Sequence, residues 1–149
     1  MGALLTLVLA TALAAGALAG PPAQQNPPGL PVVSADRFAS DLTASGEALQ
    51  GVGHLLQQAT QLSVLQRLLP AARRQLARFD AAVRRMRGYR LAKASLERKR
   101  RALARAGPPL GSTMRRFVVL GAEGDIAEAK ALTPLLLTRL QGFLAAAKA

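Results

Sequence analysis

Arginine is the residue type in this chain with the clearest chemical potential, because it is concentrated in one region. Of the twenty Lys and Arg residues, sixteen lie between Arg67 and Arg116, and the only acids in that stretch are Asp80 and Glu97. The region therefore carries a formal charge of +14, against −2 for the rest of the chain and +12 in total. A field this concentrated raises the local concentration of anionic partners and speeds their encounter with the protein.

Two interpretations of this region stay open. The first is a solvated helix face, stabilised by the i,i+4 pairs Asp80 with Arg84 and Glu97 with Arg101. The second is a surface that binds phospholipid headgroups, lipopolysaccharide, acidic glycans or an acidic protein. Specific nucleic-acid recognition is not expected, since only Tyr89 could stack on a base there. The residues predicted to bind an anionic partner are Arg73, Arg74, Arg78, Arg84, Arg85, Arg98, Arg100 and Arg101.

The sequence contains few residues that could act in catalysis. His54 is the only imidazole, and no carboxylate lies one helical turn from it to orient it as a base. The chain has no Cys, so neither a disulfide nor a thiolate metal site can form. The sequence thus predicts no catalytic residues, no metal and no cofactor, and we expect a protein that is not an enzyme.

The N-terminus resembles a secretion signal. Residues Leu4 to Leu18 are uncharged and apolar or small apart from two threonines, and Ala17-Leu18-Ala19 is a small-x-small cleavage pattern. We predict a signal peptide at residues 1–19, cleavage before Gly20 and a secreted or periplasmic protein, with an uncleaved anchor as the alternative. Residues 20–33 contain most of the prolines and are expected to form a disordered linker before a helical domain at 34–149.

The first predicted helix has Ser34 as its N-cap, Asp36 in its first turn, and an end near Ser63. Its three glycines leave open whether the middle is a weak point or a place where another helix approaches closely; they are Gly46, Gly51 and Gly53. Its apolar seam alternates spacings of three and four residues and consists of Phe38, Leu42, Ser45, Leu49, Val52, Leu56 and Ala59.

A second predicted helix begins near Val64 or Pro70 and ends at Arg87. After Gly88 the apolar stripe rotates, so residues 66–106 form either two helices, with a third helix running from Tyr89 to Ala106, or one long helix that changes its packing partner. In both cases Gly107-Pro108-Pro109 is expected to end the helix. The seam of the second helix consists of Leu69, Ala72, Leu76, Phe79, Val83 and Met86.

The C-terminal region is predicted to add a short helix over 112–120 and a last helix. Asp125 is the expected N-cap of that last helix, with Glu128 completing a capping box, and Pro134 is expected to bend it. Together these segments predict an all-α fold, an antiparallel bundle of three to four helices held by packing alone.

A short motif supports a second hypothesis. Leu62-Ser63-Val64-Leu65-Gln66 is similar to the Leu-Thr-x-x-Gln motif of periplasmic helical stress chaperones, with Ser63 in place of Thr. Leu132-Thr133-Pro134 resembles a second copy, in which Leu136 replaces the final Gln. The resemblance implies a helical protein that shields exposed apolar segments of protein clients. The residues expected to contact clients are Leu65, Leu91, Phe117 and Val119.

Overall fold

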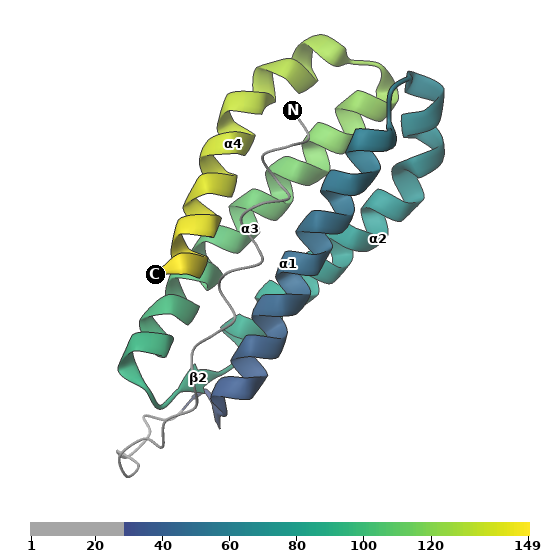
Figure 1. Ribbon diagram of the computed structural model, residues 1–149. Coiled ribbons are helices and arrows are strands. Elements are labelled where there is room, and N and C mark those ends of the chain that lie inside the picture. Colours follow the sequence, from purple (N-terminus) through teal and green to yellow (C-terminus); the bar gives the residue numbers. More distant parts are fainter. Residues whose placement is uncertain (1–28) are drawn as a thin grey trace.

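Four helices make up nearly all of the part of the chain that the structure, a computed structural model, describes, which is residues 29–149. The helices run up and down in an antiparallel bundle (Figure 1), which confirms the predicted fold class. The predicted signal peptide and its cleavage site lie outside the described residues. The elements are β1 (Val32–Val33), α1 (Ala35–Gln58), α2 (Leu62–Arg87), β2 (Arg90–Leu91), α3 (Ala94–Glu123) and α4 (Ile126–Lys148).

The start of α1 follows the predicted capping chemistry. The Ser34 hydroxyl oxygen accepts a hydrogen bond from the Arg37 N–H at 3.2 Å, and Asp36 lies in the first turn. The helix ends at Gln58, earlier than the expected Ser63, because the chain leaves helical geometry at Ala59. Its buried side is the predicted seam, from Phe38 onward.

The three glycines of α1 lie within one continuous helix. The helix is continuous through all three, and a Cβ atom built on Gly51 would lie 2.7 Å from the side-chain Cδ of Gln75 on α2. Gln75 is a flexible side chain that can move aside, so this contact does not by itself set the spacing of the two helices. The alternative of a break in the middle of the helix is contradicted, and Gly46 and Gly53 are buried within the bundle.

Helix α2 begins at Leu62, near the Val64 alternative, so Pro70 lies inside it rather than in its first turn. The predicted seam is confirmed: Leu76, Phe79 and Met86 are fully buried. Gly88 ends the helix, which confirms the two-helix alternative for residues 66–106. The chain then forms β2, which pairs in parallel with β1, and the Arg90 N–H donates to the Pro31 carbonyl at 2.9 Å. Val32 and Val33, which the sequence placed in the predicted linker, therefore belong to the folded part, and residues 20–28 of that predicted linker lie outside the described residues.

The predicted third helix, Tyr89 to Ala106, was wrong at both ends. Helix α3 begins at Ala94 and continues through the Gly107-Pro108-Pro109 sequence to Glu123, absorbing the short helix expected at 112–120. Gly107 is needed inside α3, because a Cβ there would lie 2.6 Å from both methyl carbons of Val83 on α2. Both prolines are exposed, so water can satisfy the carbonyls that lose their helical donors.

The chain reverses between α3 and α4 at Gly124, which adopts a left-handed conformation with φ of +83°. Asp125 then caps α4 as predicted, accepting from the Glu128 N–H at 3.2 Å. Helix α4 continues through Pro134 to Lys148. Phe143 anchors it in the core, edge-on to Phe79 with ring centroids 5.3 Å apart.

The packing between helices is uneven around the bundle. Helix α1 packs on α2, α2 on α3 and α3 on α4, whereas α1 and α4 approach each other much less closely. Only Ala129 and Phe143 of α4 are fully buried, and Leu135 and Leu137 are about half exposed. The bundle is therefore open along its α1–α4 side and closed along its α2–α3 side.

Candidate anion-binding face

The basic region of the sequence folds into α2 and α3, the two helices that pack directly on each other. Because the apolar seam of α2 is turned into the core, its arginines are left on the outer side of the helix. We define the cationic face as the exposed basic side chains of α2 and α3 that could reach a partner. They are Arg67, Arg73, Arg74, Arg78, Arg84, Arg87, Arg98, Arg101 and Arg105, whereas the exposed Arg85, Arg115 and Arg116 pair with acids on other helices.

Arg85 lies at the α1 edge of this face and is already engaged. Its Nε donates to Oδ1 of Asp41 at 2.6 Å, and the Tyr89 hydroxyl donates to Oδ2 of the same carboxylate at 3.0 Å. Burial, together with this hydrogen bond to an anion, raises the pKa of Tyr89 above its ordinary value. Arg37 approaches Asp41 at 3.6 Å. The cluster links α1 to α2, so Arg85 acts first as a structural residue.

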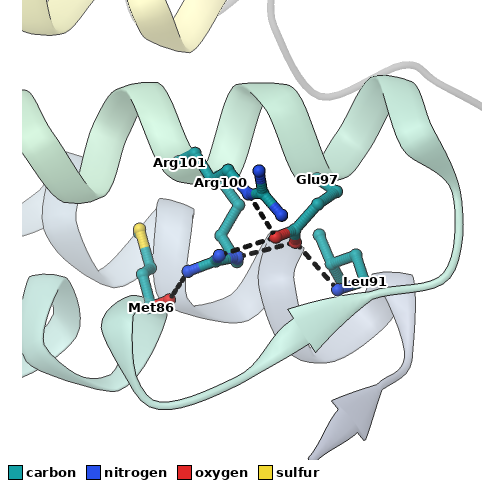
Figure 2. Close-up of polar contacts among 5 residues, drawn as sticks. All are labelled: Met86, Leu91, Glu97, Arg100 and Arg101. Atoms are coloured by element: carbon teal, nitrogen blue, oxygen red, sulfur yellow. Dashed lines mark hydrogen bonds and ion pairs between the residues drawn. The ribbon is translucent and has the colours of Figure 1, made fainter. Parts of the chain in front are cut away.

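Arg100 departs most from what the sequence predicted. Its side chain is only 6% exposed, and Figure 2 shows it directed toward Glu97 and the end of α2. Nε donates to Glu97 Oε2 at 2.8 Å, one terminal nitrogen donates to Glu97 Oε1 at 2.7 Å, and the other donates to the Met86 carbonyl. A guanidinium held in this way cannot reach a macromolecule, so Arg100 is withdrawn from the predicted binding residues.

Glu97 is the centre of that cluster. Besides Arg100, it accepts from Arg101 Nε at 2.8 Å and from the Leu91 N–H at 2.9 Å (Figure 2). Burial raises the pKa of Glu97, but the hydrogen bonds from Arg100, the Leu91 N–H and Arg101 outweigh it and lower the pKa to about 2. The carboxylate stays ionised at neutral pH. It ties β2 to α3 directly, and it orients Arg100, which in turn holds the end of α2 through the Met86 carbonyl.

The sequence contained a signal for the position of Arg100. Leu96, Arg100, Leu103, Gly107 and Leu110 follow one another at spacings of 4, 3, 4 and 3 residues. Arg100 therefore occupies a place in the apolar seam of α3, and a carboxylate lies three residues before it. A basic residue at a seam position with an acid one turn away predicts a buried ion pair rather than a binding residue.

The predicted i,i+4 pairs had different outcomes. Glu97 with Arg101 is confirmed. Asp80 instead pairs with Arg115 of α3. Arg84 therefore remains exposed and has no acidic partner within residues 29–149.

A broad, solvent-open hollow on the cationic face lies where the end of α2 meets the first half of α3. It has a volume of about 450 Å³, and we call it the arginine pocket; it is lined by Arg87, Arg100, Arg101, Ala104, Arg105 and Pro108. Neither Arg87 nor Arg105 has an acceptor in the described part of the chain. The sequence-based list omitted both, although Arg87 lies one turn after Arg84 and Arg105 one turn after Arg101.

A second hollow lies between α1 and α2 and has a volume of about 360 Å³. Arg78 and Arg85 line it together with Glu47. Here a carboxylate offsets part of the positive charge, and Arg85 is bound to Asp41. The arginine pocket is therefore the more cationic of the two hollows.

On the open side of the bundle, α1 and α4 are separated by an apolar cleft whose floor is α3. It is small, about 60 Å³, and its lining is almost entirely nonpolar. Its residues are Leu49, Val52, Gly53 and Leu56 of α1, Met114, Phe117 and Val118 of α3, and Leu136 and Leu140 of α4.

The residues considered for other chemistry are placed as follows. His54 is exposed on α1, as expected for a surface histidine. Within residues 29–149 no group of three or more His, Asp and Glu side chains is placed to hold a metal ion. In the same stretch, no helix combines the length and the hydropathy required to span a bilayer.

Comparison with known proteins adds no identification: no family model, no curated protein and no solved structure matches this chain. The class of protein is thus defined by its own fold and surface. It is an all-α four-helix bundle with a cationic outer face on α2 and α3.

Proposed function

We propose that the protein binds anionic partners through its cationic face and performs no catalysis. The partner is an anionic component of the cell envelope, such as a phospholipid headgroup, or an acidic protein. The observation that carries this proposal is the exposure of unpaired guanidinium groups. Arg73, Arg74, Arg78, Arg84 and Arg98 are all exposed and have no acidic partner in residues 29–149.

Charge balance favours this interpretation over a merely solvated face. A solvated face needs acids interspersed with its bases, because like charges one turn apart destabilise a helix. Here both acids of the basic region are engaged, Asp80 with Arg115 and Glu97 with Arg100 and Arg101. The remaining arginines repel one another, and an anionic partner relieves that repulsion.

The test is co-sedimentation of the full chain with vesicles across a salt series. Vesicles of phosphatidylglycerol and phosphatidylcholine present negative charge, and vesicles of phosphatidylcholine alone are the neutral control. We expect binding to the anionic vesicles only. It should disappear as salt rises from about 0.01 M to about 1 M, because the Debye length falls from about 30 Å to about 3 Å. Vesicle binding that does not change with salt concentration would contradict the proposal.

A matched pair of variants locates the binding surface. Arg73→Gln with Arg84→Gln removes two exposed charges from the cationic face, and Lys130→Gln with Lys148→Gln removes two exposed charges from α4. Vesicle binding should weaken in the first double variant and stay close to the parent in the second. Equally weak vesicle binding by the two double variants would mean that only the total charge of the protein matters, and it would contradict binding through the cationic face.

If the proteins bind no vesicle, an acidic protein partner is the remaining branch of the proposal. The same two double variants then serve in a cross-linking experiment with cell-envelope extracts. Capture of an acidic protein by the parent and by the α4 variant, but not by the variant of the cationic face, would support that branch.

The proposed location outside the cytoplasm depends on the apolar segment Leu4–Leu18 and the cleavage pattern that ends at Ala19. N-terminal sequencing of protein recovered from the medium or periplasm tests it. A mature chain beginning at Gly20 is expected. Full-length protein found only in the cytoplasm would contradict both export and the proposed encounter with the envelope.

The apolar cleft favours a second candidate function, that of a chaperone-like protein that shields apolar client segments. Phe117, one of the predicted client-contact residues, lines the cleft, whereas Leu91 is buried in the core and is withdrawn. A volume of about 60 Å³ holds a single small side chain. Capture of a longer segment therefore requires α4 to move away from α1, which their sparse contact permits.

Suppression of client aggregation separates the two candidates. Leu136→Gln makes one wall of the cleft polar, while Leu137→Gln alters its exposed neighbour on the same helix. A chaperone-like function predicts that the first variant fails to keep an unfolded client soluble and the second succeeds, both at moderate salt. No suppression by the parent would eliminate this candidate.

A further inference from the structure

The arginine pocket brings positive charge from two helices into one hollow. Arg87 is the last residue of α2, while Arg100, Arg101 and Arg105 belong to the first half of α3. The only carboxylate bonded to any of these four side chains within residues 29–149 is that of Glu97. Four guanidinium groups around one carboxylate leave a net charge of +3 at the pocket.

The four arginines have different amounts of free donor capacity. Arg100 uses all three of its nitrogens on Glu97 and the Met86 carbonyl, so it contributes charge at the pocket wall rather than contacts. Arg101 uses only Nε, on Glu97, which leaves its two terminal nitrogens for a ligand while the side chain is held in place. Arg87 and Arg105 are uncommitted in the described part of the chain.

This donor arrangement suits a compact anion with several oxygens and more than one negative charge. A guanidinium fork donates two parallel hydrogen bonds to a phosphate or a carboxylate, and forks converging from two helices can bind different oxygens of one tetrahedral group. A phosphate monoester carries close to two negative charges at neutral pH and can accept from three oxygens. A diester carries one charge and compensates the pocket less well.

We propose that the arginine pocket, through Arg87, Arg101 and Arg105, binds a phosphate monoester group, presented by a lipid headgroup or by a soluble phosphate compound. This inference rests on the proposed function, since it names the chemical group that one part of the cationic face selects. It differs in one respect: a charged face attracts any anion, whereas the pocket distinguishes a monoester from a diester even when the two are presented on surfaces of equal total charge.

The first test is a titration of the full chain with inorganic phosphate at constant ionic strength, followed by the NMR signals of the arginine Nε–H groups. The signals of Arg87, Arg101 and Arg105 should shift with a common saturation curve. Those of Arg73 and Arg74, which are exposed elsewhere on α2, should change little. The proposed phosphate site would be overturned if the NMR signals of all arginines shifted equally, or if the shifts did not saturate with rising phosphate concentration.

Two double variants with the same loss of charge provide the matched control. Arg87→Gln with Arg105→Gln removes the two uncommitted pocket groups, and Arg73→Gln with Arg74→Gln removes two exposed groups outside the pocket. The pocket variant should weaken phosphate binding at least tenfold, which corresponds to about 1.4 kcal/mol, and the control less than twofold. All four side chains are exposed, so both variants should fold, and circular dichroism checks this. Equal weakening would reduce the pocket to nonspecific charge and overturn the proposal.

Vesicles then distinguish the two sources of the monoester. Phosphatidic acid presents a monoester and phosphatidylglycerol a diester, and the two vesicle types are prepared at equal total charge. Preferential binding to phosphatidic acid, lost in the pocket variant, identifies a lipid headgroup. Saturable binding of glycerol 3-phosphate without any vesicle preference identifies a soluble compound. Either result supports the pocket.

The experiments also separate this inference from the proposed function. If anionic vesicles bind at low salt but no saturable phosphate site exists, the cationic face stands and the pocket is refuted. If phosphate saturates the pocket but no anionic vesicle or acidic protein binds, the proposed function fails and the pocket stands as a site for a soluble ligand.

Discussion

Replacement of Glu97 by Gln is the most direct test of how the two middle helices are held together. The substitution keeps the shape of the side chain but removes the charge that Arg100 and Arg101 share, and it turns one acceptor oxygen into an N–H2 donor. Arg100, with a side chain only 6% exposed, then loses its counter-ion. Removing one partner of a buried ion pair leaves an uncompensated charge in a poorly solvated place.

The size of the effect follows from the pKa. The fold lowers the pKa of Glu97 from 4.5 to about 2. At about 1.4 kcal/mol for each pKa unit, the ionised carboxylate stabilises the folded state by about 3 kcal/mol. This agrees with the cost of about 3–5 kcal/mol for breaking a buried pair. We therefore expect Glu97→Gln to lower the free energy of unfolding at neutral pH by about 3 kcal/mol.

The pH dependence provides the second half of the test. Because the folded pKa of Glu97 lies below the unfolded one, its stabilisation is complete above pH 4.5 and is lost as the pH falls toward about 2. The difference in stability between parent and variant should therefore be constant at neutral pH and shrink through that acidic range. Urea unfolding followed by circular dichroism at several pH values measures both quantities.

Glu123→Gln is the matched control, since Glu123 is exposed at the last position of α3. Its effect should stay within about 0.5 kcal/mol at every pH, as expected for a surface substitution. Two results would refute the assigned role of this carboxylate. One is a decrease of less than about 1 kcal/mol in the free energy of unfolding of Glu97→Gln at neutral pH, and the other is a stability difference between parent and variant that does not shrink at acidic pH.

Three further substitutions test the packing of the bundle by thermal or urea unfolding. Gly107→Ala should destabilise by about 1–3 kcal/mol because its Cβ would overlap the Val83 methyl groups, and Val83→Ala in the same chain should recover part of that loss; additive effects would contradict the close approach. Tyr89→Phe should cost about 1–3 kcal/mol by removing a hydrogen bond to the buried Asp41 carboxylate, and an unchanged unfolding midpoint would argue against it. Phe143→Ala should cost about 3–5 kcal/mol and raise amide hydrogen exchange in α4 first; uniform exchange throughout the bundle would show that α4 is not held separately.

The sequence predicted those features of the fold that depend on residues close together in the chain. The buried seams of the first two helices are periodic over short windows, and the caps at Ser34 and Asp125 each involve a residue three positions away. Helix boundaries that rest on such local chemistry were predicted to within a few residues. The class of fold followed from them, because amphipathic helices of this length must pack against one another.

Local reasoning was wrong about α3 because the decisive contacts are distant in sequence. Gly107, Pro108 and Pro109 have the composition of a helix end, yet the close packing of Gly107 against Val83 of α2 accounts for a glycine inside the helix. The prolines lie on the exposed side of the helix, where water can bond the carbonyls that lose their helical donors. Nothing within the three residues themselves distinguishes this outcome from a helix end.

The sequence indicated which segment carries the candidate site, but not which arginines of that segment belong to it. Charge counting placed the cationic face on the correct segment, yet it treated every arginine alike. Arg85 is separated by 44 residues from the carboxylate that engages it. Arg87 and Arg105 become neighbours of one hollow only after two helices pack. Which arginines are free is a property of the tertiary contacts.

The two proposed binding regions lie on opposite sides of α3, and this geometry makes them separable by mutation. Arg105 lines the arginine pocket and Met114 lines the apolar cleft, nine positions later in the same helix. At about 100° per residue, nine positions place the two side chains about 180° apart. A substitution in the pocket therefore leaves the cleft intact, and the reverse also holds. Loss of anion binding with unchanged client protection, or the opposite, would identify which side of the bundle the protein uses.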